Sequence, residues 1–525
     1  MKKRKIVMSA IAGGLAALML AGCNGGTDGG STQDVTKLEG TLASADPLTL
    51  TVHMHFWGTN VFDDTWPVYQ EAAKRTNITL HGTASKTNTE SDQVFNTMLT
   101  SEPLPDIIHG ESKNLNKAGT DGALIPLQDL VDKYAPHIKA IFDEHPEYKK
   151  ATLAADGNLY YIPCLRDDAG PAQGWFIRQD WLDKLGLPVP TTVDEYYNTL
   201  KAFRDQDPNG NGKKDEVPFF DRHNSVDKLV GLWNPGTGDV TTFGDYSIDK
   251  DGNVYCARTT EGYKTAMKEL AKWYAEGLID QEIFTRKNPR EALFGDNTGG
   301  ATNDWFSSTM SFNEKTKGKY PEFHLAVIPP VKNVEGEIKN QFARNATAGI
   351  GWGISKDNKH VPETMKYFDF WFTEEGSLLN AMGIEGTHYT VENGEQKYTD
   401  MVLGYEGGGA PNYMRTIGGQ EIGYFAELGP EIAGMTGEAA EGFKEYADNK
   451  WTVKAFPSLS YTSEEERTIA AKGTALTTYM KESQQNWILG NKDVDASWDQ
   501  YVSDLKSLGL DEVIAAYQAA YNRQK

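Results

Sequence analysis

Cysteine is scarce in this chain and accounts for three of its 525 residues. Cys23 follows an N-terminal apolar run, which leaves Cys164 and Cys256 for the rest of the chain. Two cysteines are too few for a disulfide framework, although a single bridge between them stays open. The stability of the folded part must therefore come from a hydrophobic core, and roughly 480 residues are enough for two or more domains.

Basic residues and long apolar runs are also few. The chain has 52 Lys and Arg against 74 Asp and Glu, a formal net charge of -22. Loss of four basic residues with an N-terminal signal would bring the net charge to about -26. Such an acidic surface repels phosphate backbones, which excludes nucleic acid as a partner. After residue 20, no apolar stretch reaches the length needed to span a membrane.

The N-terminus has the order of an export signal. Residues 2–5 are basic, an apolar run extends from Ile6 to Leu20, and "LAGC" ends at Cys23. This ending resembles the bacterial lipobox, in which the cysteine is acylated, for example with palmitate. The resemblance implies a protein anchored by lipid at Cys23 on the extracytoplasmic face of the cell membrane; the alternative is a secretory signal with a chance cysteine. Residues 24–47 are expected to form a flexible tether.

Strands and helices alternate over the following segment. Period-2 and period-3.6 patterns predict strands and helices in the order 48–57 (strand), 63–77 (helix), 78–85 (strand), 91–102 (helix) and 104–110 (strand). This alternation is typical of an α/β lobe with a largely parallel sheet. The stretch around Pro163 is predicted to pass between lobes, and helices are expected to dominate 174–206.

Several segments resemble one family in their order along the chain. They are "LPDII", "LIPLQDLVDKYAP", "YYIP", "WFIRQDWLDKLGLPVPTTVDEYYNTLKAF", "DPNGNGKKDEVPF", "GIGWGISKDNKHVPETMKYFDFWFTEEG" and "GIEGTHYT". The set resembles the carbohydrate-binding extracellular solute-binding proteins of ABC importers, in particular the Gram-positive lipoproteins and the alginate-oligosaccharide binders. The resemblance implies an α/β, two-lobed periplasmic-binding-protein-like fold with hinge crossings and an interlobe ligand cleft. The implied lobes are an N-lobe of 48–170 and 329–385 and a C-lobe of 171–328 and 386–525.

The loop "DQDPNGNGKKDE" (205–216) has the composition of a calcium site. Calcium takes six to eight oxygen ligands along a turn with glycine at the sharp bend. A register that begins at Asp205 places Gly210 sixth and Glu216 twelfth, as in an EF-hand. The other register uses Asp207, Asn209, Asn211, the Lys213 carbonyl, Asp215 and Glu216. A similar loop in the alginate binders favours this second register and a structural Ca²⁺. The alternative is an ordinary polar turn.

Aromatic residues are the main candidates for contact with sugar, since flat rings stack on the C–H faces of sugars. The chain contains 12 Trp and 24 Tyr, most of which are expected in the core. The candidates at positions that the resemblance assigns to the cleft are Trp57, Trp175, Trp305, Trp352, Glu385, Tyr389 and Arg344. Arg178 is expected to pair on a helix surface, while Trp66, Trp371 and Tyr367 are expected to pack in the core.

The implied function is capture without catalysis. A monomeric, membrane-anchored subunit would bind an oligosaccharide and deliver it to the permease subunits of an ABC importer; the identity of the sugar stays open. A glycoside hydrolase, which needs two carboxylates about 5 to 10 Å apart, and a sugar sensor without transport are the alternatives. The chain has no G-x-S-x-G, H-E-x-x-H, P-loop or dinucleotide fingerprint. His53 and His55 are too few for a metal-capturing site.

Overall fold

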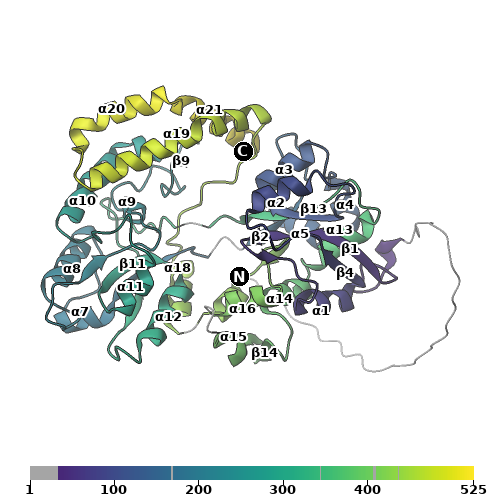
Figure 1. Cartoon of the computed structure of the whole chain (residues 1–525), viewed down its shortest axis with the longest axis horizontal. Coiled ribbons are helices and arrows are strands. Elements are labelled where there is room, and N and C mark those ends of the chain that lie inside the picture. Colours follow the sequence, from purple (N-terminus) through teal and green to yellow (C-terminus); the bar gives the residue numbers. More distant parts are fainter. Residues whose placement is uncertain (1–33, 167–169, 343, 406–408, 436) are drawn as a thin grey trace. The chain divides into compact units, whose positions relative to one another are not determined.

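The computed structural model describes residues 34–166, 170–342, 344–405, 409–435 and 437–525. Cys23 and the export signal lie outside the described residues. Residues 35–525 form one compact unit. It contains two large hydrophobic cores, each with its own sheet (Figure 1). The expected α/β, two-lobed architecture is therefore confirmed. No helix in the described part of the chain is both long enough and apolar enough to cross a bilayer.

The first core surrounds a six-stranded sheet. Its strand order is β16 (Tyr424–Ala426), β6 (Ile162–Arg166), β13 (Thr347–Ile354), β5 (Ile107–Glu111), β1 (Leu48–His53) and β4 (Ile78–Gly82). As expected for strands joined by helices, β1 runs parallel to both β4 and β5. Strand β13, which comes from the second half of the chain, runs antiparallel to β5 and β6.

Short helices connect and cover this sheet. They are α1 (Pro67–Thr76), α2 (Ser91–Met98), α3 (Ser112–Thr120), α4 (Gln128–Tyr134), α5 (Pro136–Glu144), α6 (Pro146–Thr152), α13 (Val361–Phe370), α14 (Glu374–Met382), α15 (Asp400–Leu403), α16 (Ala410–Ile417) and α17 (Leu428–Ala433). Helices α1, α5, α6 and α13 have proline at one of their first two positions, where the missing N–H costs no hydrogen bond. Trp66, Trp371 and Tyr367 are buried in this core, as predicted.

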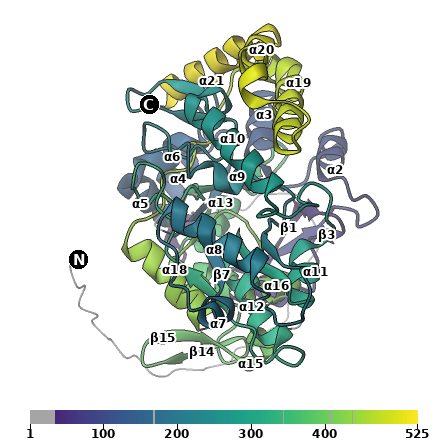
Figure 2. The same cartoon turned by 90° about the vertical axis from the view of Figure 1, so that its left-hand side faces the viewer.

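The predicted strand 48–57 is two strands. The chain turns at the buried Met54, and β2 (His55–Trp57) pairs with β3 (Asn60–Val61) in a separate hairpin. Gly58, with φ of 55°, permits the tight turn between them. A second hairpin, β14 (Tyr389–Glu392) with β15 (Glu395–Tyr398), lies beside α15 (Figure 2).

The second core surrounds a four-stranded sheet. Its order is β12 (Leu325–Ile328), β7 (Gly174–Arg178), β11 (Gly299–Asp304) and β8 (Val217–Phe219), with a two-stranded ladder of β9 (Tyr246–Ile248) and β10 (Val254–Cys256) apart from it. The helices of this lobe are α7 (Gln179–Leu185), α8 (Val193–Asp205), α9 (Asp227–Val230), α10 (Glu261–Ala275), α11 (Pro289–Gly295), α12 (Phe306–Thr316), α18 (Glu438–Asp448), α19 (Ser463–Ile488), α20 (Val494–Ser507) and α21 (Leu510–Gln524). Two 3-10 turns, Val35–Lys37 and Ala257–Thr259, complete the secondary structure.

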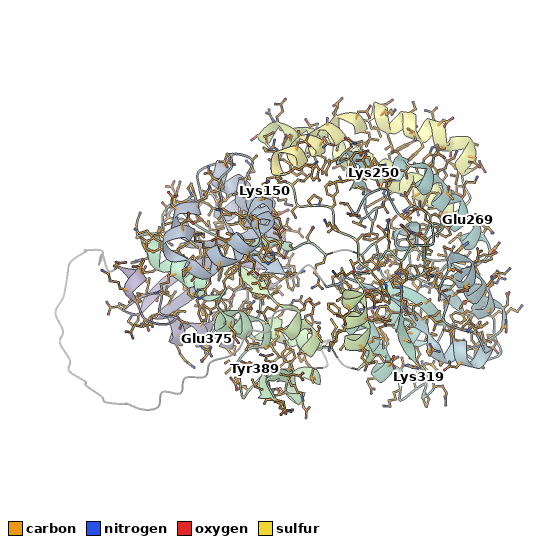
Figure 3. All side chains as sticks on the ribbon, turned by 180° about the vertical axis from the view of Figure 1, so that it is seen from behind. Lys150, Lys250, Glu269, Lys319, Glu375 and Tyr389 are labelled. Carbon is orange, nitrogen blue, oxygen red and sulfur yellow. The ribbon has the colours of Figure 1, made fainter. Side chains whose placement is uncertain are left out.

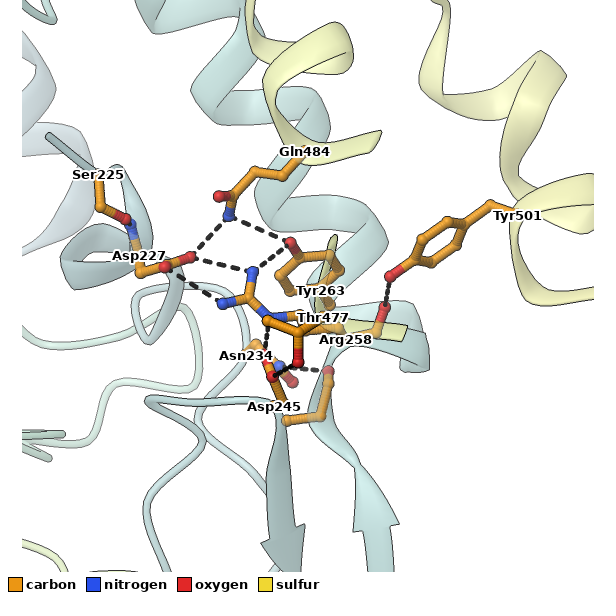
Figure 4. A network of polar contacts seen from close by, with 10 residues as sticks. Ser225, Asp227, Asn234, Asp245, Arg258, Tyr263, Thr477, Gln484 and Tyr501 are labelled. Atoms are coloured by element: carbon orange, nitrogen blue, oxygen red, sulfur yellow. Dashed lines mark hydrogen bonds and ion pairs between the residues drawn. The ribbon is translucent and has the colours of Figure 1, made fainter. Parts of the chain in front are cut away.

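The three C-terminal helices pack on one another; α19 and α20 also pack on α10, and α21 packs on β10 (Figure 1). A polar network centred on Arg258 joins them to the second core (Figure 4). The Arg258 guanidinium donates to Asp245 at 2.6 Å and to Asp227 at 3.2 Å. Gln484 of α19 donates to the same Asp227 carboxylate at 2.6 Å. Because Arg258 is only 5% exposed, this network fixes α19 through buried, charge-assisted bonds.

Two boundaries differ from the sequence prediction. Residues 35–43, expected in a flexible tether, pack on the first core: Ala43 is fully buried, and Lys366 Nζ donates to the Val35 carbonyl at 2.9 Å. The chain also returns to the second core later than residue 386, because β16 still belongs to the first sheet. The segment from Ala439 onward then joins the second core. Cys164 and Cys256 are buried, one in each lobe, and are not bridged.

Candidate functional site

Trp57 is held at the tip of the β2–β3 hairpin and is half exposed, at 51%. The ring of His55 holds the hairpin in place through both nitrogens, with Nδ1 2.8 Å from Ser91 Oγ and Nε2 2.8 Å from the Asn88 carbonyl. Arg415 of α16 lies over the indole, its guanidinium carbon 5.5 Å from the ring centroid. A rigid, accessible aromatic surface is thus paired with a cation.

Trp305 offers a second accessible indole, 42% exposed, directly after strand β11. The preceding residue, Asp304, is fully buried, and its two carboxylate oxygens each lie 3.3 Å from a guanidinium, one from Arg222 and one from Arg290. Arg290 also donates to Ser308 at 2.9 Å and lies 3.9 Å from Glu291. Burial lowers the pKa of Arg290, although the nearby Asp304 opposes this shift. Two cations share the one buried carboxylate, and Glu291 is more distant from Arg290 and exposed, so positive charge remains beside Trp305.

Two further arginines are held by glutamates. Arg344 forms a bidentate pair with Glu431, at 2.7 and 2.9 Å, and lies over the Phe443 ring. Arg166, at the end of β6, pairs closely with Glu421. Each pair joins two residues that are more than eighty positions apart in the sequence. The pairs therefore hold separate segments of the chain together at this site.

These groups line one cavity of about 560 Å³, named here the main cavity. Its lining comes from both lobes: Tyr398 and α16 belong to the first core, and Phe306 and Phe443 belong to the second. Trp57 lies on the hairpin that follows β1, and Trp305 directly follows β11. The charged lining residues are Arg166, Arg222, Arg290, Arg344, Arg415, Glu421, Glu427 and Glu431. In a chain of net charge -22, a cavity with more arginines than acids is an exception to the general charge balance.

Three of the residues predicted to bind ligand line the main cavity: Trp57, Trp305 and Arg344. Trp175 and Trp352 do not, since they are 5% and 0% exposed. Trp175 packs on Tyr196, and Trp352 stacks on Phe368 with 4.7 Å between ring centroids. Arg178 is also buried, between the rings of Trp181 and Phe323, rather than on a helix surface. The segment "GIGWGIS" belongs to the core strand β13, and its glycines allow the neighbouring backbone to pack closely against it.

Glu385 and Tyr389 line a different cavity, beside α14 and β14. Its other charged lining residues are Arg75, Glu374 and Glu375; Glu375 and Tyr389 are labelled in Figure 3. The prediction missed Arg222, Arg290, Arg166 and Arg415, which come from four separate segments of the chain. No local sequence pattern distinguishes these arginines from surface arginines, because only the fold brings them together.

The loop 207–216 is closed on itself. Asp207 accepts from the backbone N–H groups of Asn211 and Gly212 at 3.1 and 3.0 Å. The side-chain amides of Asn209 and Asn211 both reach Asp215 at 3.1 Å. Gly210 and Gly212 have φ of 73° and 74°, as the sharp turns require. Asp205, the start of the alternative register, is instead engaged by Arg204 at 2.7 Å.

Glu216 is the group in this loop that lacks a partner. Both of its carboxylate oxygens are solvent-excluded and without a hydrogen bond, and burial, followed by Asp207 and Asp215, raises its pKa. Across the described ranges, no cluster of three or more His, Cys, Asp or Glu is gathered closely enough to hold a metal ion. The loop would instead complete a cation shell with amide and backbone oxygens, which calcium accepts.

Comparison with known proteins decides the family. The model of the bacterial extracellular solute-binding protein family matches residues 60–377, well over half of the chain. The chain belongs to this family. Among solved structures, the alginate-binding protein AlgQ2, determined without calcium ion, is 40% identical, with a TM-score of 0.77 over 92% of this chain and all of that one. A structure of FusA in complex with kestose aligns over 90% of this chain and 99% of that one at 25% identity, with a TM-score of 0.68.

Two curated relatives cover most of the solute-binding chain. The fructooligosaccharide ABC transporter substrate-binding protein FusA of Streptococcus pneumoniae serotype 4 (strain ATCC BAA-334 / TIGR4) is 28% identical over 83% of this chain and 84% of its own. Lipoprotein LipO of Bacillus subtilis (strain 168) is 24% identical over 97% of both chains. FusA is a substrate-binding protein by its name, which points away from an enzyme.

Proposed function

We propose that this protein captures an oligosaccharide that carries carboxylate groups and delivers it to the permease of an ABC importer. The observation that carries the proposal is the main cavity, where two exposed indoles, Trp57 and Trp305, each lie beside arginines. An indole stacks on the apolar face of a sugar ring, and a guanidinium binds a carboxylate in a bidentate manner. The two tryptophans belong to different lobes, so one ligand that contacts both bridges the two lobes.

Electrostatics favour an acidic ligand over a neutral one. Arg222 and Arg290 share a single buried carboxylate, that of Asp304, and Arg415 has the ring of Trp57 and the amide oxygen of Asn412 as its contacts. A carboxylate from the ligand would supply the missing counter-charge. The similarity to a protein named for alginate binding supports the same class, while FusA shows by its name that the wider family also takes neutral fructooligosaccharides.

A ligand bound in the main cavity would favour closure of the two lobes. Because both lobes line the main cavity, a bound oligosaccharide stabilises the form in which the lobes approach each other, by its differential affinity for that form. The permease would then recognise the closed form. The protein would be tethered by an acylated Cys23, and similarity to lipoprotein LipO supports this anchor.

We also propose a structural calcium ion in the loop 207–216. The residues that would hold it are Asp207, Asn209, Asn211, the Lys213 carbonyl, Asp215 and Glu216. The unpartnered carboxylate of Glu216 supports the proposal, because a cation would neutralise it. A calcium ion there clips the end of α8 to the start of β8, in the second lobe, and takes no part in ligand contact.

Isothermal titration of the purified protein tests the binding function. Oligogalacturonates, alginate oligomers and neutral inulin-type fructooligosaccharides are titrated in turn, and the sugars are then examined for cleavage. We expect at least one acidic series to bind and to remain intact, with affinity that falls as salt rises. Binding of only neutral sugars would contradict the acidic class, cleavage would indicate a hydrolase, and no binding in any series would contradict the function itself.

A further inference from the structure

A second cavity adjoins the main cavity on the far side of Trp57. This outer cavity has a volume of about 430 Å³. Trp57, Asn412 and Arg415 line both cavities, so these three side chains form a ridge between them. The ridge is ordered by its own contacts: Arg415 donates to the amide oxygen of Asn412 at 2.8 Å and lies over the indole of Trp57. A ligand that passes over the ridge leaves the main cavity and enters the outer one.

The outer cavity carries the polar groups that a sugar chain needs. Asn60, paired in register with Trp57 on the β2–β3 hairpin, contributes an amide, and Tyr405 contributes a phenol. Lys86 adds an ammonium whose side chain is 60% exposed and which binds Asp63 at 2.9 Å. The outer cavity thus offers amides, hydroxyls, the Lys86 ammonium and the Asp63 carboxylate around an aromatic ridge, and such groups bond to the hydroxyls of a sugar unit.

The ridge distinguishes short oligosaccharides from long ones. A short oligosaccharide that reaches from Trp305 to Trp57 is contained by the main cavity. A longer one has an end that must leave this cavity, and the Trp57 indole, 51% exposed and shared by the two cavities, offers a stacking surface at the exit. The position of the hairpin is fixed by His55, which is 6% exposed and bonded through both ring nitrogens. The ridge is therefore preorganised before ligand arrives.

We propose that the outer cavity is an extension subsite, which binds the terminal unit of an oligosaccharide too long for the main cavity. This inference rests on the proposed function and adds to it a preference for chain length. Trp57 and Arg415 contact the unit at the exit of the main cavity, and Asn60, Lys86 and Tyr405 contact the unit beyond it. Shorter oligomers leave these three side chains in contact with water.

The test is a titration of one sugar series, the one that binds best, from two to six units. In the wild-type protein, affinity should increase by about tenfold at the length that first reaches the outer cavity and then stay constant. The variant Lys86→Gln should lower the affinity for oligomers above that length by about three- to tenfold and leave shorter oligomers unchanged. The matched control is Lys113→Gln, which removes a lysine that is 62% exposed and 3.0 Å from Glu111 and that lines neither cavity.

The outcomes separate this inference from the proposed function. A length-dependent gain in the wild type that Lys86→Gln abolishes, and Lys113→Gln retains, supports the extension subsite. Equal affinity for all lengths, or an equal loss for short and long oligomers in Lys86→Gln, overturns the subsite while the binding function stands. Failure of every length in every series to bind overturns the proposed function. Both substituted lysines are exposed, so loss of folding does not confuse the result.

Discussion

The ring of His109 lies 3.0 Å, at Nε2, from the backbone carbonyl oxygen of Glu421, a residue that lines the main cavity. His109 is 3% exposed and belongs to strand β5, in the sheet of the first lobe. A buried histidine therefore supports the cavity wall from behind. A buried imidazole is neutral, so this contact with the cavity wall depends on the protonation state of His109.

The first prediction concerns acid stability. Burial lowers the pKa of His109 to about 4, and burial together with the neighbouring His109 and His55 lowers that of His53 to about 4. Unfolding frees each ring to take up a proton near its ordinary pKa of 6.5. Between pH 6.5 and about 4, the unfolded state therefore binds more protons than the folded state, and the free energy of unfolding falls as pH falls.

Melting temperatures measured from pH 7.5 to 5.0 check this prediction, since the carboxylates with lowered pKa act mainly below that range. Burial also lowers the pKa of His223 and His388, which adds to the effect, while Asp369 raises that of His137, which opposes it. The variant His53→Gln should flatten the pH dependence. A melting temperature that does not change from pH 7.5 to 5.0 would contradict the prediction that buried histidines with lowered pKa reduce stability in acid.

The second prediction separates two tryptophans that sequence reasoning treated alike. Trp352→Ala removes a fully buried ring stacked on Phe368 and should cost about 3 to 5 kcal/mol of unfolding free energy. Urea denaturation measures this cost. The affinity of the folded fraction for ligand should be nearly unchanged, because Trp352 does not line the main cavity. A selective loss of binding with normal stability would show that the core assignment is wrong.

Trp57→Ala should behave in the opposite way. The indole is half exposed, so we expect a loss of about 1 kcal/mol or less in stability. Ligand affinity should fall at least about tenfold, since the stacking surface and the contact with Arg415 are both removed. Titration of the best-binding oligosaccharide gives the affinity, and Trp57→Phe should recover part of it. Unaltered binding in Trp57→Ala would remove this residue from the site.

The fourth prediction concerns the effect of calcium on the melting temperature. Addition of a chelator should lower the melting temperature of the wild-type protein, and Glu216→Gln should abolish the difference between the calcium-loaded and chelated forms. In the chelated form alone, Glu216→Gln should be neutral or stabilising, because it removes a carboxylate whose pKa is raised by burial and by Asp207 and Asp215. Differential scanning calorimetry measures both effects.

A matched control for this experiment is Asp249→Asn. Asp249 lies in another loop of Asp, Gly and Asn, where its carboxylate accepts from the backbone N–H groups of Asp251 and Asn253 at 2.9 and 2.8 Å. The calcium-dependent shift should survive this substitution. A wild-type protein that melts at the same temperature with and without calcium would contradict the proposed site.

The last prediction concerns the network in Figure 4. Arg258→Met leaves the carboxylates of Asp227 and Asp245 without their guanidinium and should cost about 3 to 5 kcal/mol. Urea denaturation at pH 7 measures this loss. Lys139→Met, which breaks an exposed pair with Asp143, should leave the free energy of unfolding nearly unchanged. Equal effects of the two substitutions would show that the buried network does not stabilise α19.

The sequence by itself determined the family, the alternation of strands and helices, and two of the tryptophans that line the main cavity. These depend on local patterns: the period of apolar residues gives β1, α1 and β4, although α1 begins at Pro67 rather than at residue 63. Trp66, Tyr367 and Trp371 were assigned correctly to the core because their spacing repeats with the helix. The oxygen-rich loop 207–216 was likewise visible as a local pattern.

The tertiary structure alone decided which residues meet. Arg222 and Arg290 reach Asp304, and Arg415 reaches Trp57, across 14 to more than 350 positions of sequence, so no periodic pattern records these contacts. Trp352 shows the reverse case, since the family resemblance assigned it to the cleft, whereas strand pairing with β5 and β6 places it inside the sheet. Local sequence specifies the backbone, while the position of a side chain at a cavity or in a core depends on what the rest of the chain packs against it.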